Sequence, residues 1–394
     1  MPIDRAKLID FTQRLVRIQS VNRPEEGLNE GPAADLVAEQ MRSFGWAVSV
    51  EEAAPGRPNV IAVIEGSGPG RTLMFEGHTD VVTEGDPAAW SHDPFGGEIV
   101  AGRLYGRGSA DMKSGVAAML FAGAALAEEG FPGRLVIAAL VDEEEMMLGV
   151  KDFVRRGHGA GIDGAIVCEP EDGEVCIAQK GALRIRIDSA GQMAHGAMPQ
   201  HGRNPIPPLA AFVEACIRIQ DRLQSEHGED ALLGRPYVTP TVFLAGTPEQ
   251  LNVIPAEASL FIDVRTTGAD QHAEVLDLLE SACAEGGLKL TVIDDRPATS
   301  TPMEHPLVVA VAAAHRAVHG VDCRYGGVPG STDGTILVRD AGIPIVTYGP
   351  GGKWIAHQVD EYVEVEDVVR AAEVYVEAAR RFLSRGIEAS SSRV

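Results

Sequence analysis

The chain has 394 residues, which is enough for two domains that each bury a hydrophobic core. It carries 34 Lys and Arg against 57 Asp and Glu, and its formal net charge of -23 argues against nucleic acid or an anionic membrane as a partner. Residues 1–19 lack an apolar signal core, and no apolar run reaches the roughly 18 residues of a membrane helix. The five cysteines show no paired spacing, so we expect a cytoplasmic protein.

The first part of the chain alternates predicted helices with short strands. Apolar residues at helical spacing predict the helices, and Gly and Pro residues separate the strands. The glycine-rich segment 65–70 precedes a strand and lacks the Lys-Ser/Thr ending of a phosphate loop, so we interpret it as a hairpin loop. The predicted helices cover 4–19 and 31–44, and the predicted strands cover 47–51, 59–64 and 72–75.

The segment Leu104–Gly115 is the one around which the other candidate residues are arranged. Its glycines form a turn that delivers Asp111 to the start of 112–129, an Ala-rich and apolar segment that predicts a buried helix closed by Gly130. An Asp in this position is more often a helix N-cap than a metal ligand. The metal interpretation gains weight because potential ligands occur on both sides of it along the chain, namely His78, Asp80, Glu143, Glu144, Glu169 and His357.

Alternating elements in this region indicate a largely parallel sheet covered on both faces. Ligands of such a sheet gather at the carboxyl ends of its strands. The candidates of this region occupy such ends: His78 and Asp80 after 72–75, Glu143 and Glu144 after the predicted strand 134–141, and Glu169 after the predicted strand 164–167. A helix is predicted between the last two strands, at 149–156. Two histidines and several carboxylates suit zinc or a similar divalent ion.

From about Lys180 the pattern changes to an antiparallel α+β unit. Residues 182–189 alternate between apolar and polar, as in a strand with one solvated face. We predict that this unit, 181–293, is inserted between two parts of a catalytic domain, 1–180 and 294–394. Its other predicted elements are helices at 208–223 and 270–284 and strands at 239–245, 258–265 and 289–293. The second catalytic part is predicted to contain helices at 306–319 and 365–384, a strand at 344–348 and a disordered tail at 389–394.

The spacing of the polar residues supports metal-assisted hydrolysis. His78 and Asp80 are two residues apart, so both side chains point the same way on an extended segment, and the Asp80 carboxylate can accept the second ring N–H of a ligating His78. The acidic run 142–145 ends an apolar strand, where four acids are costly unless a cation compensates them. Alternation then lets one Glu bind the metal while its neighbour acts as general base on a water.

Six motifs occur in order along the chain: Gly77-His-Thr-Asp-Val-Val82, Trp90-Ser-His-Asp-Pro-Phe95, Gly106-Arg-Gly-Ser-Ala-Asp-Met-Lys-Ser-Gly115, Asp142-Glu-Glu144 with Gly149, Cys168-Glu-Pro170 and Ala356-His357. They resemble the motifs of the co-catalytic zinc amidohydrolases and peptidases, a family that includes acetylornithine deacetylase, succinyl-diaminopimelate desuccinylase, aminoacylase-1 and glutamate carboxypeptidase. The resemblance implies an α/β catalytic domain whose mixed, mostly parallel sheet is sandwiched by helices, with an inserted α+β lid or dimerisation domain that has an antiparallel sheet.

The same resemblance implies a role for each matching residue. It implies two zinc ions, for which cobalt or manganese can substitute. The implied metal ligands are Asp111 as the bridge between the ions, His78 and Glu169 at one ion, and Glu144 and His357 at the other. Glu143 is the implied general base, and Asp80 the implied partner of His78.

The inserted unit matches the family's substrate-binding segments. Gly191–Gly196 with Gly202–Asn204 resembles the segment whose His, here His195, steadies the oxyanion, often from the partner subunit. Asn252 and Arg265 lie in segments that resemble those holding the substrate carboxylate, which an Arg can bind bidentately. Additional hydrogen bonds near the same end are expected from Gly330, Ser331, Thr332 and Asp333.

Two positions depart from the family pattern. Thr83 stands where many members have Pro, which we expect to matter little. Met146 and Met147 follow the acidic run where small residues are common, so the pocket wall near the reacting bond is expected to differ. The remaining histidines, His227 among them, have no ligand-like setting.

We therefore expect a homodimeric dizinc hydrolase that cleaves the amide bond of a small N-acyl amino acid, in the manner of a deacetylase or desuccinylase. A dipeptidase or carboxypeptidase of the same family is the alternative. A non-catalytic metal-dependent binding protein is disfavoured because such a protein has no need of Glu143. A serine hydrolase would use Ser109 or Ser331, which lie in Gly-rich turns but lack the GxSxG elbow.

Overall fold

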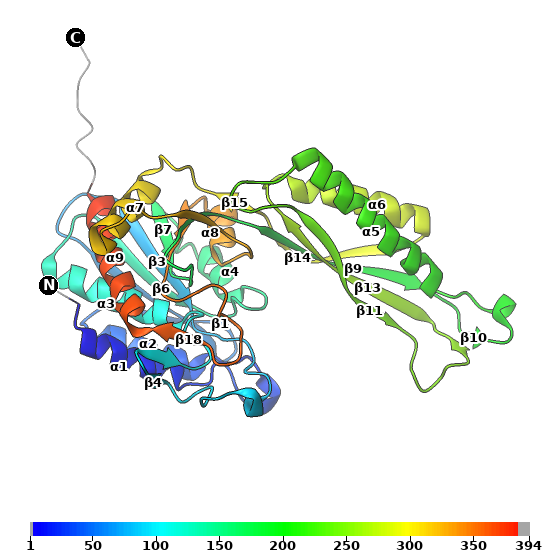
Figure 1. Cartoon of the computed structure of the whole chain (residues 1–394), viewed down its shortest axis with the longest axis horizontal. Coiled ribbons are helices and arrows are strands. Elements are labelled where there is room, and N and C mark those ends of the chain that lie inside the picture. Colours follow the sequence, from blue (N-terminus) through cyan, green and yellow to red (C-terminus); the bar gives the residue numbers. More distant parts are fainter. Residues whose placement is uncertain (1–2, 385–394) are drawn as a thin grey trace, which may run out of the picture. The chain divides into compact units, whose positions relative to one another are not determined.

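The computed structural model describes residues 3–384 (Figure 1). The chain divides into two compact units, and the second interrupts the first in sequence. The first contains Met1–Ile177, Ser300–Gly326 and Thr332–Val394, and the second contains Ala178–Thr299 and Gly327–Ser331. The predicted insert, 181–293, falls within the second unit. The tail predicted to be disordered, 389–394, lies outside the described residues.

A large mixed sheet forms the centre of the first unit. Its strand order is β1-β2-β6-β3-β7-β17-β8-β15, and β16 pairs with β8. The strands are β1 (Val48–Ala54), β2 (Arg57–Glu65), β3 (Thr72–His78), β6 (Arg134–Leu140), β7 (Gly164–Val167), β8 (Val175–Gln179), β15 (Thr299–Ser300), β16 (Tyr325–Val328) and β17 (Ile345–Thr347). The four central strands β6, β3, β7 and β17 are parallel to one another, whereas β1, β2 and β8 run antiparallel to their neighbours.

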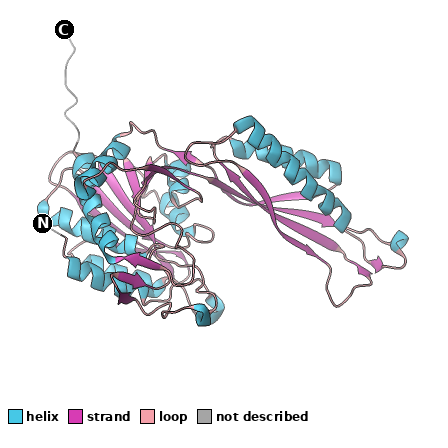
Figure 2. Cartoon of the chain, in the orientation of Figure 1, coloured by secondary structure: helices cyan, strands magenta, loops and turns pink. Residues whose placement is uncertain are grey.

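Helices cover both faces of this sheet (Figure 2). The alternation along β6 assigns its side chains to two cores: Leu135 and Ile137 pack on one face, and Val136 and Ala138 on the other. The first face is covered by α1 (Arg5–Val16), α2 (Gly31–Ser43), α3 (Lys113–Glu129), α7 (Pro306–His319) and α9 (Val365–Leu383), and the second by α4 (Leu148–Arg155) and α8 (Gly334–Ala341). The predicted α/β class with helices on both sides of a mostly parallel sheet is confirmed.

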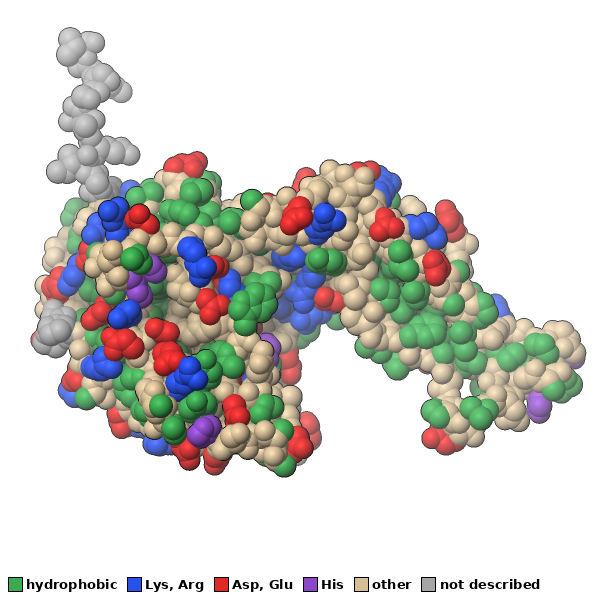
Figure 3. All heavy atoms as spheres, in the orientation of Figure 1, with side chains coloured by type: hydrophobic (Ala, Val, Ile, Leu, Met, Phe, Trp, Pro, Cys, Tyr) green, Lys and Arg blue, Asp and Glu red, His purple; other side chains and the backbone are tan. Residues whose placement is uncertain are grey.

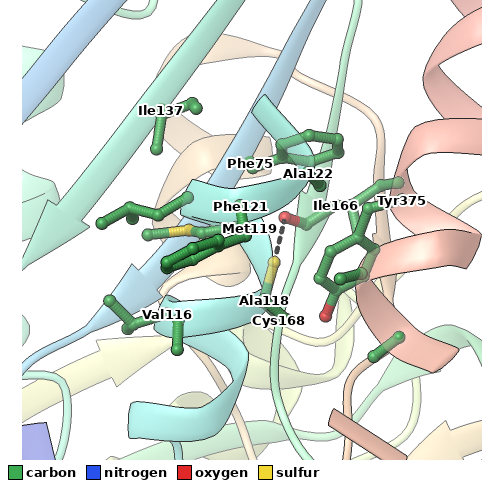
Figure 4. Packing of buried hydrophobic residues seen from close by; sticks show 14 of the residues in the cluster. Phe75, Val116, Ala118, Met119, Phe121, Ala122, Ile137, Ile166, Cys168 and Tyr375 are labelled. Carbon is green, nitrogen blue, oxygen red and sulfur yellow. Dashed lines mark hydrogen bonds between the residues drawn. The ribbon is translucent and has the colours of Figure 1, made fainter. Parts of the chain in front are cut away.

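Helix α3 lies in the middle of the larger core because it is apolar on nearly all sides. Figure 4 shows Val116, Met119 and Phe121 of this helix among side chains from the sheet and from Tyr375 of α9. Cys168 packs in the same core, with its thiol directed at the carbonyl of Ile166. The helix ends at Glu129, and the C-cap residue Gly130 has a φ of 84°, a positive value that favours glycine. This packing fixes the beginning of α3, and therefore the segment that carries Asp111.

The second unit is a four-stranded antiparallel sheet with two helices on one face. Its strand order is β11-β13-β9-β14. The elements are β9 (Gly181–Ala190), α5 (Ile206–His227), β11 (Tyr237–Ala245), β13 (Glu257–Thr266), α6 (Gln271–Gly286) and β14 (Lys289–Arg296), with a short ladder between β10 (Ala194–His195) and β12 (Val253–Ile254). Leu183, Ile185 and Ile187 of β9 face the helices, whereas Arg184 and Arg186 face away. The predicted antiparallel α+β unit is confirmed.

A small three-stranded sheet joins distant parts of the chain in the first unit. It contains β4 (Glu98–Val100), β5 (Arg103–Tyr105) and β18 (Tyr362–Glu364), with β5 in the centre. The hairpin of β4 and β5 and the short strands β8, β16 and β18 were not predicted, because segments of three to five residues carry little periodicity. Across residues 3–384, helices with the length and apolarity needed to cross a membrane are absent.

Candidate active site

Neighbouring parallel strands bring the candidate side chains to one edge of the central sheet. Strand β3 ends at His78 itself, the turn after β6 carries Glu143 and Glu144, and Glu169 follows the end of β7 by two residues. Because these three strands are parallel and adjacent, their carboxyl ends meet at the same edge. His357 comes from the long loop after β17, the next strand of the sheet.

The carboxylate of Asp111 lies between two histidines. Its Oδ1 is 3.2 Å from Nε2 of His78, and its Oδ2 is 3.2 Å from Nε2 of His357. Helix α3 begins two residues later, and its N-cap residue Met112 makes no side-chain capping bond. The simple interpretation of Asp111 as a helix cap is therefore wrong, because its two oxygens face two different imidazoles.

Each histidine also contacts a glutamate. Nε2 of His78 is 3.3 Å from Oε1 of Glu169, and Nε2 of His357 is 2.9 Å from Oε1 of Glu144. Donor atoms of His78, Asp111 and Glu144 lie within 4.8 Å of one another, and so do those of His78, Glu143 and Glu169. The arrangement offers two overlapping positions for cations, with Asp111 facing both histidines.

Asp80 is buried directly beside these residues. Nδ1 of His78 is 3.0 Å from the backbone carbonyl oxygen of Asp80 and 3.5 Å from its carboxylate. The carboxylate itself accepts hydrogen bonds from the backbone N–H groups of Glu143 and Glu144, at 3.3 and 3.1 Å. The backbone carbonyl of Asp80 thus orients the His78 ring, so that Nε2 of this ring points toward Asp111. The Asp80 carboxylate holds the acidic turn. The sequence indicated only a contact of the carboxylate with His78.

The electrostatics of the cluster indicate a deficit of positive charge. Burial, followed by the charge of the nearby Asp111, raises the pKa of Glu169 to about 8. Burial also raises the pKa of Glu143 well above its ordinary value, against the opposing effect of His78. Hydrogen bonds to Asp111 and Glu144 raise the pKa of His357 to about 11. Carboxyl groups that retain protons and imidazoles that gain them both show that bound cations would be favoured here. The imidazole nitrogens and carboxylate oxygens are suitable donors for zinc or a similar divalent ion.

Several buried residues near the cluster were missed by the sequence analysis. Glu361 and Arg107 form a fully buried ion pair behind Asp111 and His357. Glu76, two residues before His78, lies near Asp333, and burial first and then Asp333 raise the pKa of Glu76 well above its ordinary value. Sequence could not identify these groups as buried, because isolated charges in strands and turns are usually solvent-exposed. Asp333 is itself buried at the start of α8, although hydrogen bonds near the substrate were expected from it.

The residues predicted to bind substrate lie mostly in the second unit. His195 and Asn252 are exposed and near each other: His195 pairs with Val253 in the β10–β12 ladder, and the N–H of Gly196 donates to the carbonyl of Asn252. Arg265 is half-buried on β13, where its Nε donates to Oδ2 of Asp263 at 2.8 Å. Gly330 and Ser331 belong to this unit, whereas the buried Thr332 belongs to the first.

Ser109 and the surroundings of His227 are two further places where a nucleophile or a metal site could be sought. The hydroxyl of Ser109 is buried, and within residues 3–384 it has no hydrogen-bond partner, which disfavours Ser109 as a nucleophile paired with a base. Glu226, His227 and Glu274 bring donor atoms within 4.8 Å of one another at the surface of α5 and α6, a contact of His227 that the sequence did not indicate. Nε2 of His227 is 2.7 Å from Glu274, and Glu226 is bound by Arg222, so the group forms a surface ion-pair cluster.

Comparison with known proteins gives matches along nearly the whole chain. The family model described as peptidase family M20/M25/M40 matches residues 74–381. A succinyl-diaminopimelate desuccinylase from Methylobacterium radiotolerans is 34% identical over 388 residues, which cover 93% of this chain and 94% of that protein. A protein of the same name from Cereibacter sphaeroides is 32% identical over 401 residues, covering 98% of this chain and 100% of the relative.

Solved structures share the fold. An M20 family metallo-carboxypeptidase from Sulfolobus solfataricus superposes with a TM-score of 0.80 at 20% identity, covering 97% of this chain and 99% of that chain. A protein from Bacillus subtilis, described as a dinuclear metal binding peptidase from the M20 family, superposes with a TM-score of 0.68 at 16% identity, covering 96% and 98%. At these identities the likeness concerns the fold.

Proposed function

The chain belongs to peptidase family M20/M25/M40 and is a metal-dependent hydrolase of amide or peptide bonds; from that premise we propose that it removes a succinyl or similar acyl group from a small amino acid. The observation that carries this proposal is the position of Asp111, whose two carboxylate oxygens face His78 and His357 while Glu143 lies beside the same cluster. The succinyl group is suggested by the relatives' names.

We propose zinc as the metal, with cobalt or manganese able to replace it. His78 and Glu169 would hold one ion, Glu144 and His357 would hold the other, and Asp111 would bridge them. When bound, the ions polarise the scissile carbonyl and lower the pKa of water. The donor set supports this assignment because it combines two imidazoles with carboxylates whose pKa values are raised in the metal-free cluster.

Glu143 is our proposed general base. It accepts a proton from the attacking water and returns that proton to the leaving amine. Burial raises the pKa of Glu143 well above its ordinary value, which helps the carboxyl group hold the proton between the two steps. Asp80 supports this role by accepting the backbone N–H of Glu143, which holds the turn that carries this side chain.

We propose that residues of the inserted unit recognise the substrate. Arg265 would bind the substrate carboxylate bidentately, with Asn252 beside it, and His195 would donate a hydrogen bond to the developing oxyanion. Gly330, Ser331 and Thr332 would add hydrogen bonds near the carboxylate. The exposure of His195 and the half-buried position of Arg265 support roles in contact with a ligand.

We propose a homodimer that pairs through the edge strand β11. This strand has a neighbour on one side of its sheet, and it exposes Val242, Phe243 and Leu244 at 45%, 44% and 56%. Figure 3 shows hydrophobic side chains exposed on the visible face of this unit. An open hydrophobic edge favours pairing with a second copy. Phe243→Glu is expected to give a monomer by light scattering, and an unchanged mass would contradict pairing through this edge.

The five cysteines are all free, which supports the proposed cytoplasmic location.

Substrate hydrolysis tests the proposed activity directly. The zinc-loaded and the chelator-stripped protein are assayed with N-succinyl, N-acetyl and N-formyl amino acids and with dipeptides. We expect zinc-dependent release of amino acid from the N-succinyl class. Preferred turnover of dipeptides would instead assign the chain to the peptidase alternative. Zinc binding without turnover of any class would favour the binding-protein alternative.

A further inference from the structure

A buried ion pair links the two loops that carry Asp111 and His357. These loops are 246 residues apart in sequence, and the pairing of β5 with β18 brings their ends together. Arg107 follows β5 by two residues, and Glu361 directly precedes β18. Their side chains are 3% and 0% exposed, and Nη1 of Arg107 donates to Oε2 of Glu361.

Glu361 holds the backbone of the Asp111 loop. Its Oε1 accepts two hydrogen bonds, from the N–H groups of Ala110 at 2.9 Å and of Asp111 at 3.0 Å. Two backbone donors on one carboxylate oxygen fix the direction of the peptide that precedes the Asp111 side chain. A displacement of Glu361 would therefore move the Asp111 carboxylate.

Arg107 holds the backbone of the other loop. Its Nη2 donates to the carbonyl oxygen of His357 and its Nη1 to that of Gln358, both at 3.2 Å. His357 has a left-handed backbone conformation, with φ at 65°, which is unfavourable for a residue with a side chain and needs support from its surroundings. The guanidinium also lies over the ring of Trp90, 5.2 Å from its centroid.

We propose that Arg107 and Glu361 are positioning residues that set the distance between Asp111 and His357, and thereby the affinity of the metal position formed by Asp111, Glu144 and His357. This inference rests on the proposed metal centre. The other position has different support: His78 ends strand β3, and Glu169 follows β7 within the same sheet. Loss of the ion pair should displace both Asp111 and His357 at the first position but only the shared Asp111 at the second, so the first position should weaken much more.

The same two strands provide a matched control. Arg103 and Glu364 face each other in the pairing of β5 with β18, and Nε of Arg103 is 2.8 Å from Oε1 of Glu364. Arg103 also lies over an aromatic ring, that of Tyr362, at 4.2 Å. This pair is exposed, at 43% and 40%, and the hydrogen bonds recorded for it do not involve the loops of Asp111 or His357.

The test uses Arg107→Lys, Glu361→Gln and the control Arg103→Lys in the full-length protein. Arg107→Lys keeps the buried charge pair, so it should fold, but a single ammonium cannot reach both loop carbonyls and Glu361 in the geometry of a guanidinium. Each metal-stripped variant is titrated with zinc by calorimetry, and folding is followed by circular dichroism and Tm. We expect wild type and Arg103→Lys to bind two equivalents. In Arg107→Lys and Glu361→Gln we expect one equivalent to weaken by about 10- to 100-fold, and the other, which shares only Asp111 with it, to weaken much less.

Two further measurements separate positioning from general damage. The isotherms of these variants should resemble that of His357→Ala and differ from that of His78→Ala. In kinetics, kcat should fall with KM little changed, and excess zinc should restore kcat. The inference is overturned if folded Arg107→Lys binds both equivalents as wild type does, if both positions weaken equally, or if Arg103→Lys shows the same loss. A wild-type protein that binds no zinc would instead overturn the proposed metal centre.

Discussion

Acidic residues occur on both sheets of this protein, but their surroundings differ. On the open face of the four-stranded sheet each of three aspartates has an arginine two residues away on the same strand and the same face: Asp188 with Arg186, Asp263 with Arg265, and Asp294 with Arg296. At the edge of the central sheet, Asp111, Glu144 and Glu169 converge, and their ion-pair partners recorded among residues 3–384 are histidines.

The difference lies in how charge is compensated. An acid paired with an arginine has its charge compensated and requires no ligand, whether the pair is partly exposed, as at Asp188, or buried, as at Asp294. A buried group of acids with two imidazoles has more negative than positive charge; the pKa values of Glu144 and Glu169 are raised there, first by burial and next by the charge of Asp111. Buried acids whose negative charge is incompletely compensated therefore indicate the functional site better than the number of acids does. Substituting one acid at the edge of the central sheet and one acid on the four-stranded sheet tests this difference.

The largest effect is expected for Asp111→Asn. The amide removes the charge that faces both histidines, so zinc binding should fall by more than about 100-fold and activity should be lost. Asp188→Asn, which changes a paired acid on the other sheet, should keep two equivalents of zinc and full activity. Metal analysis and the hydrolysis assay measure both variants. The distinction between the two sheets fails if the two variants lose zinc to the same extent.

The second-largest effect, a fall in kcat, is expected for Glu143→Gln. This variant keeps the size of the side chain and loses the base, so we expect kcat to fall by about 100- to 10,000-fold. Zinc stoichiometry should remain two, because Glu143 is not among the proposed ligands. Loss of a zinc equivalent would show that Glu143 is a ligand, as its nearness to His78 and Glu169 would also allow.

A smaller effect, on KM, is expected for Arg265→Met on the four-stranded sheet. Removal of a charged partner of the substrate carboxylate should raise KM by about 10- to 100-fold, since a hydrogen bond to a charged group contributes about 1.5–3 kcal/mol. Zinc binding should not change. Arg186→Met, an exposed arginine on the same face with its own aspartate, is the control and should leave KM unchanged. Equal kinetics for the two variants would remove Arg265 from the substrate site.

The smallest effect is a pH dependence of stability in the metal-stripped protein. Glu169 has a pKa of about 8 when folded, against an ordinary value of 4.5, so between these values the folded state holds a proton that the unfolded chain has lost. Stability should therefore fall as pH rises through this window, and Tm should be a few degrees lower at about pH 8 than at about pH 5. The raised pKa of His357 acts in the same direction at higher pH. Glu169→Gln should flatten the profile; a Tm that rises with pH in the stripped wild type would contradict the assignment.

Much of the fold could be predicted because its long elements carry clear periodicity. The predicted helix at 306–319 and strand at 164–167 agree with α7 and β7, and the alternation of 182–189 identified β9 and its helix-facing side. Helix α5 begins before the predicted range 208–223, because Pro207 and Pro208 occupy its first turn, where proline is tolerated, and it continues to His227. Short pairings such as β5 with β18 depend on tertiary contacts and leave no local pattern.

The site could be predicted at the level of residue types and strand ends, but not at the level of contacts. Nothing local to Asp80 indicates that its carbonyl contacts His78 while its carboxylate holds the acidic turn. Arg107 and Glu361 are 254 residues apart, and burial distinguishes them from the exposed pair Arg103 and Glu364 beside them. Such relations follow from the packing of distant segments, which a single sequence does not contain.

The chain leaves the first unit after Ile177 and returns at Ser300, and these two points are adjacent: the N–H of Thr301 donates to the carbonyl of Ile177 at 2.8 Å. Because the first unit holds the two ends of residues 178–299 close together, inserting a segment between them costs little loop-closure entropy. A change in the length of residues 178–299 can therefore be accommodated at this junction, although the second unit also receives Gly327–Ser331 from a separate part of the chain. The strand ends that carry His78 and Glu169 lie outside residues 178–299, so such a change leaves them in place.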